Sequence, residues 1–180
     1  MSETPESIIT FWRAAGPGAW FKKNDAFDAQ IRARFEETHH AAARGELAAW
    51  EETADGALAL LLLLDQFPRN MYRDSPHAFA ADPLARAAAA KAIARGFDRA
   101  AAPDMRGFFY LPFEHSEDPE DQVRSVALFT AAGDESLLKW ARLHADIIAR
   151  FGRFPHRNRA LARATTPAEQ DFLDAGGFAG

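Results

Sequence analysis

Apolar residues in this chain recur at the spacing of an α-helix. Phe27, Ile31 and Phe35 fall at i, i+4 and i+8, and the same period returns over 140–147, which places side chains on one helix face. No alternating apolar run reaches the length of a strand. Alanine, leucine, arginine and glutamate, which all favour helices, dominate the composition. The pattern predicts an all-α fold.

A capping residue followed by proline marks the predicted helix starts. Such a pair satisfies free N–H groups of the first turn and puts proline where its missing N–H costs nothing. The pairs are Thr4-Pro5, Ser75-Pro76, Asp82-Pro83, Asp118-Pro119 and Thr166-Pro167, and Glu169 completes a capping box with Thr166. With the apolar spacing, they predict helices over 5–14, 25–44, 46–52, 56–66, 76–80, 83–96, 104–110, 119–132, 134–151 and 167–175.

The bulk properties restrict the class of protein. The connections between predicted helices are short and no linker interrupts the 180 residues, so we expect a single domain over 1–180 with antiparallel helix neighbours. A net charge of −5 argues against nucleic-acid binding. The chain has no cysteine, and residues 1–6 lack the features of a signal peptide, which fits a cytoplasmic location. The longest apolar run, 57–64, is far shorter than the roughly 20 residues of a membrane span, so no membrane association is expected.

The first polar cluster follows the apolar run 58–64. Asp65 ends this run, where a carboxylate opposes the helix dipole and loses hydration, so it requires a cationic or donor partner. Arg69 and the arginines of 150–163 are the candidates. One interpretation is a structural ion pair that fastens the helix; the other is a ligand pocket. The candidate residues of this segment are Asp65, Gln66, Arg69 and Asn70.

The second cluster follows an aromatic run that ends near Pro112. His115 stands between Glu114 and Glu117, and neighbouring carboxylates suit an imidazole that acts as an acid or base. The alternative is that residues 116–118 only cap and charge the start of the next helix. Capping leaves the histidine unexplained, so His115 and Glu117 are candidate catalytic residues.

The third cluster is rich in arginine. Five arginines lie between 150 and 163, and no acidic residue occurs from 147 to 168. Guanidinium groups suit carboxylate or phosphate groups; the alternative is a solvated basic face. The candidates here are His144, Arg153, His156, Arg157 and Asn158. The chain has no metal-ligand spacing, no glycine-rich phosphate loop and no nucleophile elbow, and the adjacent His39 and His40 are expected at the surface.

Two of these clusters share a pattern. Residues 65–70 and 153–158 each place Phe-Pro at a predicted helix exit and follow it with arginine and asparagine within three residues. The two prolines are too far apart in the chain for one structural repeat. We therefore interpret the pattern as similar chemistry at two helix ends.

Three segments together resemble a bacterial family, the domain of unknown function family 924 of the tetratricopeptide-like (TPR-like) superfamily. They are Leu-Leu-Asp-Gln-Phe-Pro-Arg-Asn at 63–70, Tyr-Leu-Pro-Phe-Glu-His-Ser-Glu at 110–117 and His-Ala-Asp-Ile-Ile-Ala-Arg-Phe-Gly-Arg-Phe-Pro-His-Arg-Asn at 144–158. The resemblance covers nearly the whole chain, from 11 to 176. It implies a TPR-like array of antiparallel helix pairs, in which these are signature segments. Glu114 departs from the pattern, since an uncharged residue is expected there in many relatives.

Two functions are consistent with these residues. In the first, a pocket binds a small anionic molecule and carries out a hydrolytic reaction. Its ligand-binding residues would be Asp65, Gln66, Arg69, Asn70, Arg153, Arg157 and Asn158, and its proton-transfer residues His115, Glu117, His144 and His156. In the second, the helical array is a scaffold that binds a protein or peptide, and the polar segments are internal ties between helices.

Overall fold

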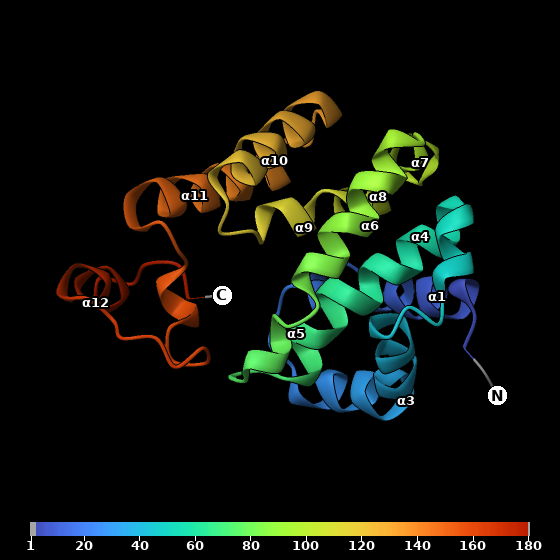
Figure 1. Ribbon diagram of the computed structural model, residues 1–180, viewed down its shortest axis with the longest axis horizontal. Coiled ribbons are helices and arrows are strands. Elements are labelled where there is room, and N and C mark those ends of the chain that lie inside the picture. Colours follow the sequence, from blue (N-terminus) through green and yellow to red (C-terminus); the bar gives the residue numbers. More distant parts are fainter. Residues whose placement is uncertain (1–2, 180) are drawn as a thin grey trace. The chain divides into compact units, whose positions relative to one another are not determined.

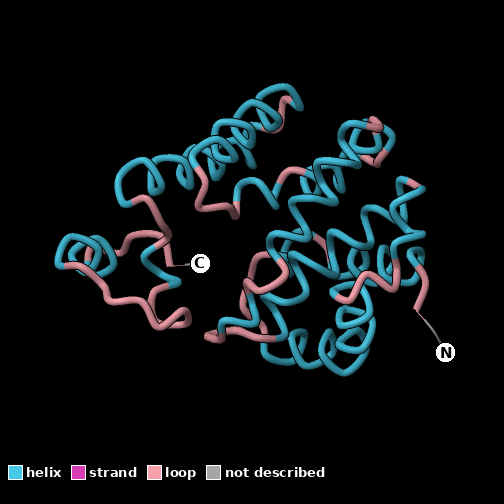
Figure 2. The backbone as a smooth tube through the Cα atoms, viewed as in Figure 1, coloured by secondary structure: helices cyan, strands magenta, loops and turns pink. Residues whose placement is uncertain are grey.

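The structure is a computed structural model that describes residues 3–179 of the chain. Every regular element within those residues is helical, and no strand occurs among them (Figure 2). The predicted all-α class is therefore confirmed. The chain folds into two compact units, which are described separately: unit 1 is Met1–Arg73 with His77–Pro112, and unit 2 is Asp74–Pro76 with Phe113–Gly180. Within residues 3–179, we find no helix whose length and apolar character would suffice to cross a membrane.

Unit 1 is built around one helix that is buried on all sides. Its elements are α1 (Pro5–Ala15), α2 (Pro17–Trp20), α3 (Asp25–Ala43), the 3-10 helix η1 (Ala48–Glu52), α4 (Ala54–Leu61), the π-helix η2 (Leu62–Gln66), α5 (Phe67–Met71), α6 (Asp82–Ala94), α7 (Phe97–Ala100), α8 (Pro103–Arg106) and the 3-10 helix η4 (Gly107–Phe109). Helix α4 packs against α1 and α6, and its continuation packs against α3 (Figure 1). An aromatic cluster that includes Trp12, Phe35 and Phe67, all fully buried, lies beside it. The apolar run of the sequence is therefore the core helix that was predicted.

The helix that contains Phe67 does not end at Phe-Pro. The helical run continues from α4 through η2 into α5, so the predicted helix exit at Pro68 is wrong. Proline has no N–H for an i−4 bond, and its ring collides with the carbonyl four residues earlier, here that of Leu64. The wider π turn, in which the Phe67 amide donates to the carbonyl of Leu62, accommodates the proline without ending the helix.

The π turn also explains an unexpected histidine. The side chain of His39 donates from Nδ1 to the carbonyl oxygen of Leu63, at 2.8 Å, and is buried, while His40 is exposed. Burial lowers the pKa of His39, although its hydrogen bond to Leu63 opposes this effect. The expectation of a surface position was therefore wrong for His39, because the sequence did not reveal the carbonyl that the π turn makes available.

Unit 2 is a helical hairpin followed by a short C-terminal helix. Helix α9 (Leu111–Glu114) and the 3-10 helix η3 (Pro76–Ala78) each begin in one unit of the chain and end in the other. The main elements are α10 (Pro119–Ala132), α11 (Glu135–Phe151), the 3-10 helix η5 (Pro155–Arg157) and α12 (Pro167–Asp174). Helices α10 and α11 lie side by side (Figure 1), joined by a left-handed glycine, Gly133, and the N-cap residue Asp134. Apolar side chains of α11 and α12 form the core of this unit together with Phe154 and Phe178.

The residues that were predicted to cap the starts of helices had different outcomes. The side chains of Thr4, Asp118 and Thr166 accept hydrogen bonds from first-turn amides, and Thr166 forms the predicted capping box with Glu169. Asp82 does not cap its helix. It is the first residue of α6 rather than the N-cap, because its carboxylate is held by a guanidinium from another helix.

Candidate functional site

The polar residues at the end of the core helix are paired with one another. Asp65 is almost fully buried, and its Oδ1 lies 3.2 Å from Nη1 of Arg69. The same guanidinium donates to both oxygens of Asp82, at 2.9 and 3.0 Å, and to the backbone carbonyl of Asp65, at 2.7 Å. Gln66 donates from Nε2 to Asp65 Oδ2 at 2.6 Å. The arginine predicted to bind a ligand therefore joins two carboxylates inside unit 1, as in the structural interpretation.

Asn70 belongs to a second buried contact in unit 1. Its Nδ2 donates to Oδ1 of Asp28 on α3, at 2.8 Å. Arg73 donates to both oxygens of the same carboxylate, at 2.5 and 3.1 Å. Asp28 and Arg73 were not predicted as site residues. The network fastens α5 to α3. The ligand-binding role of Asn70 stays a prediction.

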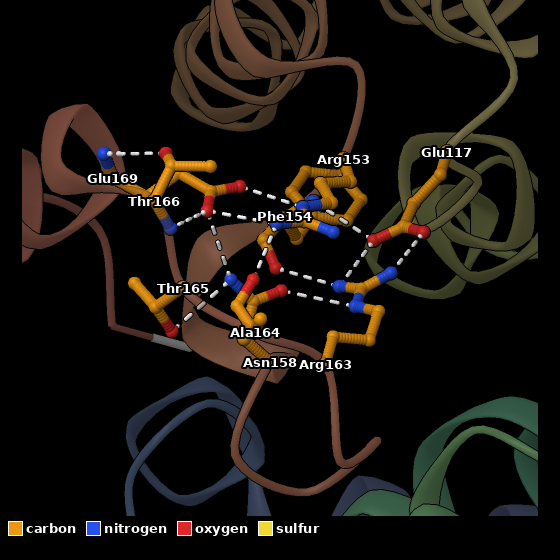
Figure 3. Close-up of polar contacts among 9 residues, drawn as sticks. All are labelled: Glu117, Arg153, Phe154, Asn158, Arg163, Ala164, Thr165, Thr166 and Glu169. Carbon is orange, nitrogen blue, oxygen red and sulfur yellow. Dashed lines mark hydrogen bonds and ion pairs between the residues drawn. The ribbon is translucent and has the colours of Figure 1, made fainter.

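Glu117 lies in a polar network of unit 2 (Figure 3). It accepts two hydrogen bonds from Arg163, at 2.7 and 3.0 Å, and one from the backbone amide of Phe154, at 2.8 Å. Burial opposes ionisation of Glu117, but the hydrogen bonds from Arg163 and Phe154 and the charge of Arg157 outweigh it, so its pKa is lowered. Glu117 is therefore an anion at neutral pH and positions the loop after α11.

Glu169 is the second anchor of this network, and it was predicted only as a cap. Arg153 donates to its two carboxylate oxygens, at 2.6 and 2.9 Å, and Asn158 donates to one of them, at 3.2 Å. The Thr166 amide adds a bond at 2.7 Å. The hydrogen bond from Arg153, supported by Thr166, lowers the pKa of Glu169 to about 2. Figure 3 shows Arg153 and Asn158 converging on this carboxylate from the loop after α11.

A histidine cluster forms the other half of the site in unit 2. We use this name for His115, His144 and His156. His144, on α11, is buried, and its Nδ1 lies 2.9 Å from the carbonyl oxygen of Trp140 and 3.4 Å from Oε1 of buried Glu114. Because a carbonyl only accepts, Nδ1 of His144 carries a proton. The His115 ring lies 6.3 Å from that of His144.

One phenylalanine joins this cluster to the arginine segment. The ring of Phe154, fully buried, lies 5.3 Å from that of His144 and 5.7 Å from that of His156. The guanidinium of Arg157, which is only 6% exposed, lies over the same ring at 4.5 Å. Two imidazoles and a guanidinium are thus gathered around one aromatic side chain.

The predicted residues therefore separate into three groups within the described chain. Asp65, Gln66, Arg69 and Asn70 form buried contacts in unit 1; Glu117, Arg153 and Asn158 hold the loop of unit 2; His144, His156 and Arg157 lie around Phe154, with His115 beside His144. The catalytic and ligand-binding roles stay predictions. No group of three or more metal-ligating side chains among residues 3–179 is arranged to hold an ion. Sequence reasoning missed Arg163 as an individual residue, although it belongs to the basic run, and it had no signal for Phe178, described below.

A family model and a solved structure both match nearly the whole chain. A family model described as "Bacterial protein of unknown function (DUF924)" matches residues 8–177. A solved structure, that of the protein of unknown function ATU0120 from Agrobacterium tumefaciens, is similar with 50% sequence identity and a TM-score of 0.93, over 96% of this chain and 97% of that chain. No curated protein matches. The chain belongs to the DUF924 family of bacterial proteins, as its three polar segments indicated.

Proposed function

We propose that unit 2 binds a small anionic ligand at the histidine cluster and transfers a proton to or from it. The observation that carries the proposal is the gathering of His144, His156 and Arg157 around Phe154, at ring-centroid or guanidinium distances of 5.3, 5.7 and 4.5 Å. Imidazole N–H groups and a guanidinium bind carboxylate or phosphate groups. An aromatic wall with a few convergent polar groups is the usual composition of a small-molecule site.

Arg157 is the arginine that lies against the aromatic ring shared with the histidines, and we assign the anionic group to it for that position. Arg153 and Arg163 each make two hydrogen bonds to one carboxylate, Glu169 and Glu117 respectively, and we assign them a structural role.

The reaction class that fits this arrangement is hydrolysis. With its proton on Nδ1, His144 would accept a proton from water at Nε2, and the hydroxide formed would add to a carbonyl or phosphoryl centre. The imidazolium would return the proton to the leaving group. Glu114, at 3.4 Å from Nδ1, would stabilise the imidazolium between these steps.

A thermal-shift screen against phosphorylated and carboxylated metabolites tests the proposal. We expect one or more of them to raise the melting temperature, because imidazole N–H groups and a guanidinium bind anions. The shift should disappear in His144→Gln and remain in His40→Gln, whose residue is exposed in unit 1. Hydrolysis of phosphate and carboxylate esters is then measured for the same variants. An absence of any stabilising anion, or an equal shift in all three proteins, would contradict the site.

A second candidate function, a TPR-like scaffold for a protein or peptide, is favoured by a different observation. The polar segments contain many mutually paired residues, as internal ties would, and helices α10 and α11 expose Val123 and Trp140. An acidic or phosphorylated peptide would bind this hairpin, and Val123→Ser would weaken its binding without affecting small anions. Fluorescence anisotropy with labelled acidic peptides distinguishes the two functions. The lack of cysteine supports a cytoplasmic location for either one.

A further inference from the structure

The segment after α12 folds back onto α11 through two glycines. The amide of Gly176 donates to the carbonyl of Leu173, at 3.1 Å, and that of Gly177 to the carbonyl of Phe172, at 3.0 Å, which is the Schellman arrangement of a helix C-terminus. Gly176 has the left-handed conformation, with φ +78°. A Cβ on Gly177 would lie 2.6 Å from both the ring and the carbonyl oxygen of Phe172. Only glycine fits there, so the two residues fix the direction of the segment that follows.

The segment places Phe178 on the histidine cluster. Its ring lies 4.6 Å from that of His144 and 5.1 Å from that of His156, with interplanar angles of 64° and 83°. It also lies 6.3 Å from the ring of Trp140. These are edge-to-face and tilted contacts of the kind that aromatic rings prefer.

Each of the two histidines therefore lies beside two phenylalanine rings, and the two rings differ in how they are held. Phe154 is fully buried, and its backbone is fixed by Glu117 and Arg163. Phe178 is only partly buried and lies in a non-helical segment beyond the last helix. Segments with few regular hydrogen bonds open at a lower free-energy cost than packed helices. Phe178 is the ring that an incoming molecule would displace.

We propose that Phe178 occupies an aryl subsite of the histidine cluster and that the ligand is an aromatic anion, an aryl carboxylate or aryl phosphate. This proposal rests on the function proposed above. The ligand ring takes the place of the Phe178 side chain between His144, His156 and Trp140, and its anionic group meets the imidazoles and Arg157. The segment 176–178 is an internal competitor that the ligand displaces.

Competition by the segment predicts a gain of affinity when the segment is removed. If Phe178 occupies the subsite in nine molecules of ten, its removal strengthens binding about tenfold, because apparent affinity scales with the competent fraction. Phe178→Ala removes the ring. Gly177→Ala keeps the ring but forces the backbone away from Phe172, so the two variants reach the same open state by different routes. Phe21→Ala, an exposed phenylalanine of unit 1, is the matched control.

Calorimetry with four probes tests the inference: benzoate and phenyl phosphate, with acetate and inorganic phosphate as their counterparts without a ring. We expect both aryl probes to bind more tightly than their counterparts, and Phe178→Ala and Gly177→Ala to bind the aryl probes about tenfold more tightly than the wild type and Phe21→Ala. Circular dichroism confirms that each variant keeps its helices. Equal affinities for aryl and non-aryl probes, or aryl affinities unchanged in both folded variants, would overturn the aryl subsite.

The outcomes also separate this inference from the function on which it rests. Binding of acetate and phosphate in all proteins, without any preference for a ring, would leave the anion site standing and remove the aryl subsite. Failure of all four probes in the wild type and in both open variants would remove both. Aryl binding that persists in His144→Gln with undiminished affinity would place the ligand elsewhere and also contradict the inference.

Discussion

The substitution Glu169→Gln measures how strongly the polar network holds unit 2. Glu169 is 2% exposed, and its side chain accepts from Arg153, Asn158 and the Thr166 amide. A depression of its pKa from 4.5 to about 2 would correspond to about 3 kcal/mol of the free energy of unfolding if solvent did not screen the interaction. Arg153 is 29% exposed, and solvent screens its charge, so we expect a loss of about 1 to 2 kcal/mol at pH 7.

The assay is urea-induced unfolding followed by ¹⁹F NMR of 5-fluorotryptophan, which resolves Trp140 in unit 2 from the tryptophans of unit 1. With a urea dependence of about 2 kcal/mol per molar, the midpoint reported by Trp140 should fall by about 0.5 to 1 M. Glu46→Gln is the control, because Arg44 donates to Glu46 at 2.6 and 3.0 Å, nearly the same geometry, but at the surface. We expect no measurable change for that variant.

The stabilisation by Glu169 should depend on pH in one direction. The pKa of Glu169 is lower in the folded protein than in the unfolded chain, so its stabilising contribution is present above about pH 4.5 and is lost as the pH falls towards 2. The difference between wild type and Glu169→Gln should therefore shrink towards zero over this range. A difference that stays constant from pH 7 to pH 2, or a midpoint unchanged at pH 7, would refute the reasoning.

Two further predictions concern unit 1. Gly56→Ala should destabilise the protein by about 2 kcal/mol, since its Cβ would overlap the backbone carbonyl oxygen of Trp50; thermal unfolding should show no such loss for Gly18→Ala, where the added Cβ meets nothing. Absorbance at 295 nm should reveal no tyrosine ionising near pH 10 in the folded protein, because burial and a hydrogen bond to a carboxylate raise the pKa of Tyr72 to about 12 and raise that of Tyr110 as well. A step of one tyrosine near pH 10 would contradict this.

Local signals in the sequence predicted the fold better than they predicted the contacts of the polar residues. The capping roles of Asp118 and Thr166 depend on neighbours within three residues, and both are confirmed. Glu117 meets Arg163 across 46 residues of sequence, and no local rule specifies such a partner. The candidate residues were therefore identified as polar clusters, but their pairing depended on how the helices pack.

Pro68 shows a different limit of sequence reasoning. A proline after a long apolar helix normally predicts the helix end, and this expectation failed because the chain absorbs the proline in a π turn. The same turn gives Leu63 a side-chain donor, His39, which was expected at the surface. Backbone geometry, rather than residue type, decided both outcomes.

The π turn accommodates one residue more than an α-helical turn of the core helix would. Each residue of an α-helix advances the side chains by about 100°, so a regular α-helix through 62–66 would rotate everything beyond it by about that angle, whereas the wider π turn absorbs the extra residue. Without the π turn, Arg69 would face away from Asp82, and Asn70 away from Asp28, although neither residue had changed. A homologous chain that has one residue fewer between α4 and Pro68 should therefore lack the π turn and still make both contacts.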